Sequence, residues 1–181
     1  GKSNFCAGVY LDEDAAGFCV CDISTGKTHV TAFAGPERLT HLGNELGRFA
    51  PAEAVVNEAA YFDKELHDLL TLRLHTHVEK LPDGRFAWET CEKAIRTQFG
   101  DEAVARFPKD NPAAVLSLGA LLSYLHETQK TDLSHVDEVE YYCEGQFMEL
   151  DLTARQTLEL TATLRSKDKK EMTANDEGLL T

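Results

Sequence analysis

The fold of this chain is decided by residues 113–165, which read AAVLSLGALLSYLHETQKTDLSHVDEVEYYCEGQFMELDLTARQTLELTATLR. The stretch follows Asn111 and Pro112, a pair typical of a helix start, because Asn caps helices and Pro fits their first position. Four leucines then recur at helical spacing, at positions 118, 121, 122 and 125. This spacing predicts a helix with an apolar stripe on one side.

The second half of that stretch predicts a turn, an extended segment and another helix. The polar run at 128–132 ends the leucine helix, and 138–150 is expected to be extended. Either Asp151 or Thr153 can cap a helix that reaches about residue 165. A helix, a strand and a helix in this order indicate an α/β domain.

The first third of the chain predicts the start of a mixed sheet. Alternating apolar residues and turn signals, including a turn at 12–17, predict three antiparallel strands at 5–10, 18–23 and 28–33. Leucines from Leu39 onward mark a helix that ends at Pro51, and 54–56 is short and wholly apolar, as in a buried parallel strand. The predicted fold class is therefore α/β, with a ribonuclease H-like mixed sheet flanked by helices.

Composition limits the classes of function. The chain has 181 residues, 43% of them hydrophobic and 27% charged, which is typical of a globular domain. No apolar run approaches the ~20 residues that a membrane-spanning helix needs, so no membrane partner is expected. The formal net charge of −13 is the opposite of a nucleic-acid-binding surface, and it fits either a basic protein partner or a contribution to solubility alone. Without an initiator Met or a signal peptide, the chain is expected to be an excised piece of a longer protein.

The cysteines predict core packing in a reducing compartment. There are five, an odd number, and no C-x-x-C pair. Cys19 and Cys21 alternate with their neighbours, so on a strand they share one face and act as small hydrophobic residues. A zinc site needs about four converging ligands, which this spacing does not supply. The expected location is the cytoplasm.

Several stretches of the sequence resemble one family in order and wording. They are NFCAGVY at 4–10, DISTG at 22–26, GALLSYLHETQK at 119–130, LSH at 133–135, MELD at 148–151 and TLELT at 157–161. Together they resemble the DNA mismatch repair protein MutS. The resemblance implies a connector domain over 1–146, the start of an all-α helical core domain over 147–166, and a flexible tail over 167–181.

The resemblance also implies a role without chemistry of its own. In this family the connector links the mismatch-binding domain to the core and ATPase domains and contributes to engagement of MutL. Its partners are then other MutS domains, a second MutS protomer and MutL, while mismatched DNA, ATP and Mg belong to the parent protein. The phosphate loop G-x-x-x-x-G-K-[ST] is missing here, so no catalytic, cofactor-binding or metal-binding residue is assigned. A MutS paralogue without a repair role shares the same signals.

A different class of function, a stand-alone metal-dependent nuclease, is centred on Asp22. A two-metal site needs several converging carboxylates, and the candidates to join Asp22 are Asp12, Glu53 and Asp137. This hypothesis predicts Mg²⁺- or Mn²⁺-dependent cleavage that disappears in Asp22→Asn. The competing interpretation is that 24–27 forms a hairpin turn and Asp22 only accepts hydrogen bonds at the end of a strand.

Three histidines and one helix complete the candidates. His75 and His77 would share one face of a strand and supply half of a metal site, although no third ligand is evident. His135 is expected to support a turn rather than to transfer protons. The helix at 152–165 has apolar residues on more than one side, so it is expected to need partners beyond the connector or to fold back on it.

Overall fold

The computed structural model describes residues 3–143, and six strands within them form one sheet in the order β5-β4-β1-β2-β3-β6. The strands are β1 (Phe5–Leu11), β2 (Ala15–Asp22), β3 (Thr28–Ala34), β4 (Glu53–Val56), β5 (His77–Lys80) and β6 (Val139–Tyr141). β1, β2 and β3 are antiparallel neighbours, whereas β4, β5 and β6 each pair in parallel. This mixed sheet confirms the predicted ribonuclease H-like α/β class.

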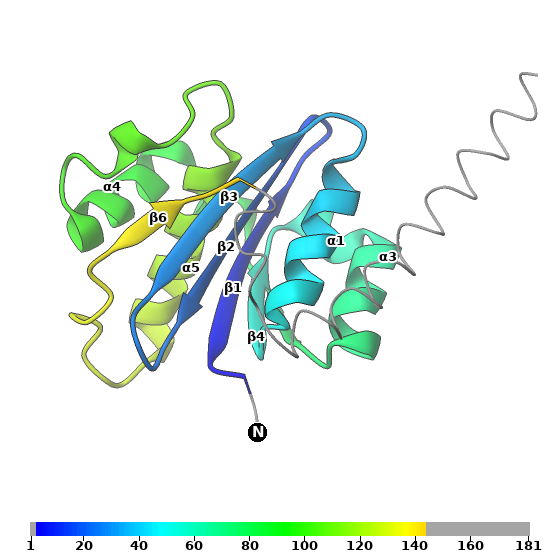
Figure 1. The fold of residues 1–181 in the computed structure, drawn as a ribbon, viewed down its shortest axis with the longest axis horizontal. Helices are drawn as coiled ribbons and strands as arrows, with labels where there is room; N and C mark the ends of the chain where they lie inside the picture. Colours follow the sequence, from blue (N-terminus) through cyan, green and yellow to red (C-terminus); the bar gives the residue numbers. More distant parts are fainter. Residues whose placement is uncertain (1–2, 144–181) are drawn as a thin grey trace, which may run out of the picture.

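Helices cover both faces of the sheet (Figure 1). They are α1 (Arg38–Phe49), α2 (Glu58–Phe62), α3 (Lys64–Asp68), the π-helical η1 (Leu69–Arg73), the 3₁₀-helical η2 (Asp83–Phe86) and η3 (Val104–Arg106), α4 (Trp88–Phe99) and α5 (Ala113–Thr128). α4 and α5 lie on one face, and α1, α2 and α3 on the other. Across residues 3–143, no helix has the length and apolar character to cross a membrane.

Alternation along the strands divides the apolar side chains into two cores. On β1, Cys6 faces the core under α5, while Ala7 and Val9 face the core under α1. Both cores contain side chains with almost no exposed surface, such as Leu118 on α5 and Leu46 on α1. The sheet is therefore buried on both faces, as its parallel part requires.

Helix α5 is buried more widely than its leucine stripe predicts. Its small residues are buried together with the leucines, because one side packs on β1 and β2 and another packs on α4. At the contact with α4, a Cβ on Gly119 would overlap the Cα and Cβ of Cys91. The prediction of a one-sided stripe was wrong because small residues that permit close approach carry no apolar signal in a periodicity count.

The turn predicted at 12–17 is shorter than expected. β2 already begins at Ala15, so Gly17 lies inside a strand rather than in a turn. A Cβ at Gly17 would collide with the carbonyl group of Ala113 at the start of α5. This glycine is therefore required for the approach of the helix and not for chain reversal.

The remaining boundaries agree with the sequence in part. The extended segment expected at 138–150 is represented by β6, and its continuation lies outside the described residues. The helix at 152–165, the tail at 167–181 and the boundary at 146 also lie outside them and remain predictions. Asn111 acts as expected at the start of α5, where its Oδ1 accepts a hydrogen bond from the Ala113 N–H.

Gly119→Ala is expected to lower the free energy of unfolding by about 2 kcal/mol or more, because the added methyl forces α4 and α5 apart. Helix propensity alone predicts the opposite sign, a gain of about 1 kcal/mol. Gly84→Ala is the matched control, since a Cβ there meets nothing within 4 Å, and it should stay within about 1 kcal/mol of the parent. Urea unfolding of both variants measures the difference, and equal stabilities would show that α5 does not need the close approach.

Candidate functional site

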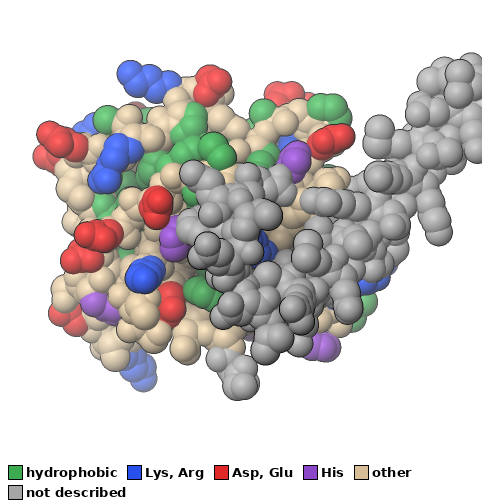
Figure 2. Space-filling view, in the orientation of Figure 1, with side chains coloured by type: hydrophobic (Ala, Val, Ile, Leu, Met, Phe, Trp, Pro, Cys, Tyr) green, Lys and Arg blue, Asp and Glu red, His purple; other side chains and the backbone are tan. Residues whose placement is uncertain are grey.

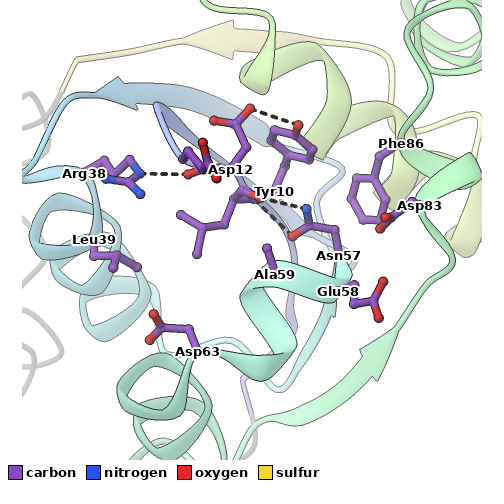
Figure 3. Close-up of a pocket in the computed structure, with 12 residues that line it drawn as sticks. Tyr10, Asp12, Arg38, Leu39, Asn57, Glu58, Ala59, Asp63, Asp83 and Phe86 are labelled. Carbon is purple, nitrogen blue, oxygen red and sulfur yellow. Dashed lines mark hydrogen bonds between the residues drawn. The ribbon is translucent and has the colours of Figure 1, made fainter.

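A cleft of about 660 Å³ lies at the carboxyl ends of the parallel strands β1 and β4 (Figure 3). Its walls come from the ends of both strands, from α1 and α2, and from η2. In open α/β sheets, ligands bind outside the carboxyl ends of strands where the connections diverge to opposite sides. β1 leads to β2 on one side and β4 leads to β5 on the other, so the cleft occupies such a position.

Asp12 reaches the cleft from the end of β1, but its oxygens are occupied. Oδ1 accepts hydrogen bonds from the N–H groups of Asp14 at 2.8 Å and Ala15 at 2.7 Å, and Oδ2 accepts from the Tyr10 hydroxyl at 3.0 Å. Burial raises the pKa of Asp12, but these hydrogen bonds outweigh it and leave the pKa below its usual value. Asp12 is thus a charged residue that shapes the β1–β2 turn.

Tyr10 is the partner of that carboxylate. Burial, followed by the hydrogen bond to Asp12, raises the pKa of Tyr10 to about 12. Its ring packs beside Phe86 of η2, with 5.9 Å between the ring centroids. A neutral phenol in this setting contributes packing and one hydrogen bond rather than a proton for transfer.

Asn57 joins the ends of the two parallel strands. Its Oδ1 accepts from the Leu11 N–H at 3.1 Å, and its Nδ2 donates to the Leu11 carbonyl at 2.9 Å. Oδ1 also accepts from the Ala60 N–H at 3.3 Å, so Asn57 caps α2. The side chain is buried, and all of these bonds hold the main chain in place (Figure 3).

The cleft carries an excess of negative charge. Among residues 3–143, Arg38 is its only cationic lining residue, and it donates from Nε to the Asp12 carbonyl at 2.9 Å and from Nη1 to the Gly35 carbonyl at 3.2 Å. The lining carboxylates are Asp12, Glu13, Glu58, Asp63 and Asp83. Yet within residues 3–143 no cluster of three or more His, Cys, Asp or Glu side chains is arranged to hold a metal ion. The cleft suits attraction of a basic group better than acid–base chemistry.

The carboxylates proposed for a nuclease do not converge. Asp22 lies opposite Phe5, at the start of β1, whereas Asp12 follows the end of β1, about 20 Å away along the strand. Glu53 lies near Asp22 along the sheet, but its side chain faces α5, where its Oε1 accepts a hydrogen bond from the Tyr124 hydroxyl. Asp137 lies in the exposed loop before β6. The structure therefore gives the Asp22-centred hypothesis no two-metal site.

Asp22 instead stabilises the β2–β3 hairpin. Its Oδ1 accepts hydrogen bonds from the N–H of Ser24 at 2.9 Å and from the Ser24 hydroxyl at 2.6 Å. Burial raises the pKa of Asp22, but hydrogen bonds from Ser24 and Thr25 more than offset this and lower it overall. The interpretation as a hairpin turn with a hydrogen-bond acceptor is confirmed.

Of the two expectations for the histidines, the one for His75 and His77 fails and the one for His135 is confirmed. His75 and His77 do not share a strand face, because His75 precedes β5 and has a left-handed backbone with φ of 54°. His77 lies beside Glu79, with 3.1 Å between Nε2 and Oε1, and the expectation that both imidazoles share one strand face was wrong. His135 supports a turn as predicted, since its Nε2 lies 2.7 Å from the Ile23 carbonyl oxygen in the β2–β3 hairpin.

The cysteine prediction is confirmed for the strands. Cys19 and Cys21 are buried on the α5 side of β2, together with Cys6 and Cys91. Burial raises the pKa of Cys6 and of Cys91 to about 12 and also raises the pKa of Cys19 and Cys21. These thiols are packing groups rather than nucleophiles.

The comparison with family models covers nearly all of the described residues. Residues 4–137 match the model of the family described as MutS domain II. The chain belongs to the MutS domain II family. The match spans the sheet from β1 to β5, together with the covering helices α1 to α5.

Curated relatives of MutS domain II agree with this assignment. The DNA mismatch repair protein MutS of Acetivibrio thermocellus is 31% identical over 169 residues, which cover 93% of this chain and 19% of that protein. The protein of the same name from Pelotomaculum thermopropionicum is 34% identical over 170 residues, covering 93% and 20%. That of Ruminiclostridium cellulolyticum is 31% identical over 169 residues, covering 93% and 19%. The chain thus spans about a fifth of the length of the relatives that it matches.

Sequence reasoning missed the residues that build the cleft in this MutS domain II. Tyr10 and Asn57 come from separate segments that the parallel pairing of β1 with β4 brings together, and Arg38 joins them from the start of α1. One local signal was present, because Asn57 directly follows an apolar strand and precedes a helix, as an N-cap does.

Asn57→Ala is expected to lower the free energy of unfolding by about 2–4 kcal/mol, because it leaves both main-chain groups of Leu11 without partners and removes a helix cap. Asp63→Ala is the matched control, since Asp63 caps α3 through one hydrogen bond to the Leu66 N–H and should cost only about 1 kcal/mol. Urea unfolding separates the two cases. Equal losses would mean that the cap, and not the link between the strands, supplies the stability.

Proposed function

We propose that this domain is the non-catalytic connector of a DNA mismatch repair protein of the MutS type. The match of residues 4–137 to MutS domain II carries this proposal. The local chemistry supports it, because the acidic residues best placed for catalysis, Asp12 and Asp22, are engaged in turn-forming hydrogen bonds. A connector of this kind links a mismatch-binding domain to the core and ATPase domains.

A connector works mechanically, and its rigidity is the relevant property. The six-stranded sheet is packed on both faces, so a displacement at one end is transmitted to the other rather than absorbed within the domain. If such a rigid domain has two orientations between flexible joints, the nucleotide state of the ATPase domain can change how tightly the mismatch-binding domain holds DNA. ATP, Mg and mismatched DNA are then bound by the parent protein in the cytoplasm, in contact with a second protomer.

A deletion and a point substitution separate the connector from the nuclease alternative. Removing the codons for residues 4–137 in frame is expected to raise the mutation frequency to that of a strain without the gene. Asp22→Asn should leave repair unchanged, because an Asn side-chain oxygen still accepts the hydrogen bonds of the turn. Loss of repair in Asp22→Asn, together with Mg²⁺-dependent cleavage by the purified chain, would favour the nuclease instead.

The carboxylates of the cleft support a further role, the engagement of MutL. On the face shown in Figure 2, acidic and basic side chains are interspersed, with no single acidic patch. The cleft differs because several carboxylates surround one arginine. A concave acidic surface attracts a basic partner surface and sets its orientation. The cleft rim is therefore our proposed MutL-facing side.

Charge reversal of the rim tests this role. The triple variant Glu13→Lys, Glu58→Lys, Asp83→Lys replaces exposed carboxylates without removing a hydrogen bond described for residues 3–143. It is expected to weaken binding of the MutL from the same organism at least about 10-fold, measured by calorimetry with the whole MutS protein.

A second triple variant controls for net charge. Glu89→Lys, Asp101→Lys, Glu102→Lys makes the same change in charge at exposed positions at the start of α4 and just after it. It should bind MutL like the parent. If both variants weaken binding equally, the effect comes from the net charge of the protein and not from the rim. If the rim variant binds MutL as tightly as the parent, the rim is not the MutL-facing side.

A further inference from the structure

The described part of the chain ends near the edge strand β6. There, Tyr142 packs on the α1 face of the sheet, although the preceding helix α5 lies on the other face. β6 pairs with the outer edge of β3, and Val139 and Tyr141 face the core under α5. The next residue, Tyr142, turns into the core under α1 and is 1% exposed. Residues 139–142 therefore contribute side chains to both cores.

Tyr142 is held on this face by a hydrogen bond to a buried carboxylate. The Tyr142 hydroxyl donates to Oε1 of Glu45 on α1 at 2.8 Å, joining residues 97 positions apart. Glu45 is 1% exposed and also accepts from Nη1 of Arg48 at 3.2 Å. Because a buried carboxylate is costly unless hydrogen-bonded and paired, both donors contribute to keeping Glu45 in this position.

β6 is a short strand at the edge of the sheet. β6 has only three residues in register with β3, followed by the Tyr142 N–H, which donates to the Val30 carbonyl at 3.0 Å. Short edge strands open at a lower free energy than the rest of a sheet. The ring of Tyr142 packs edge-on to His29 of β3, with 6.1 Å between the ring centroids.

We propose that the hydrogen bond between Tyr142 and Glu45 is a releasable latch that holds β6 on the edge of the sheet. Closed, it holds β6 against β3. Open, it releases β6 and Tyr142 from β3 while water hydrates the Glu45 carboxylate, which stays paired with Arg48. The latch is a local two-state element inside an otherwise rigid domain. It depends on the geometry alone and does not require the connector role.

Amide hydrogen exchange of the 181-residue chain tests the latch. In Tyr142→Phe, the exchange rate of the Tyr142 amide is expected to rise at least about 10-fold, because a hydrogen bond to a charged group is lost. The Leu81 amide, which donates to the Val56 carbonyl at 2.9 Å near the other edge of the sheet, should change less than about twofold. This contrast separates local opening from a general loss of stability.

Two further variants complete the test. Tyr61→Phe removes a hydroxyl near the same core, and no hydrogen bond is described for that hydroxyl among residues 3–143, so the Tyr142 amide should exchange as in the parent. Glu45→Gln keeps an acceptor but removes the charge, and should accelerate exchange less than Tyr142→Phe does. Unchanged exchange in Tyr142→Phe, or an equal rise at Leu81, would overturn the proposal.

Discussion

The close contact of α5 with the sheet is the constraint on which the rest of this structure depends. At Gly17 of β2 there is no room for a Cβ beside the Ala113 carbonyl, and at Gly119 there is none beside Cys91 of α4. A helix seated this deeply excludes water from the central strands and brings α4 onto its outer side.

The first four strands and both long crossover helices could be predicted because their signals are local. Alternation marked β1 to β3, and a short apolar run after Pro51 marked β4 as buried on both faces. Gly17 was misread because a glycine has the same appearance in a turn and beneath a helix, and only the packing partner distinguishes the two. The backbone of His75 was equally hidden, since a left-handed residue carries no periodic signal.

The candidate site shows a different kind of limit. Sequence reasoning selected Asp22 because a carboxylate followed by small hydroxyl residues is chemically suggestive, yet those hydroxyls turned out to be its turn partners. The cleft lies at the other end of β1 from Asp22. The residues that line it belong to no common sequence motif. Parallel pairing of β1 with β4 creates the cleft, and strand register cannot be read from one sequence. The wording of the family motifs identified the domain where the local chemistry did not.

The distribution of the cysteines makes one position of this domain chemically distinct. Four thiols are buried beneath α5 and resist ionisation, whereas Cys143 is exposed and directly follows Tyr142. A thiol-directed reagent therefore reaches Cys143 but not the four buried thiols. The native sequence thus provides one attachment point for a spectroscopic reporter, Cys143, two residues after the end of β6. Movements of this part of the chain can be followed without any amino-acid substitution.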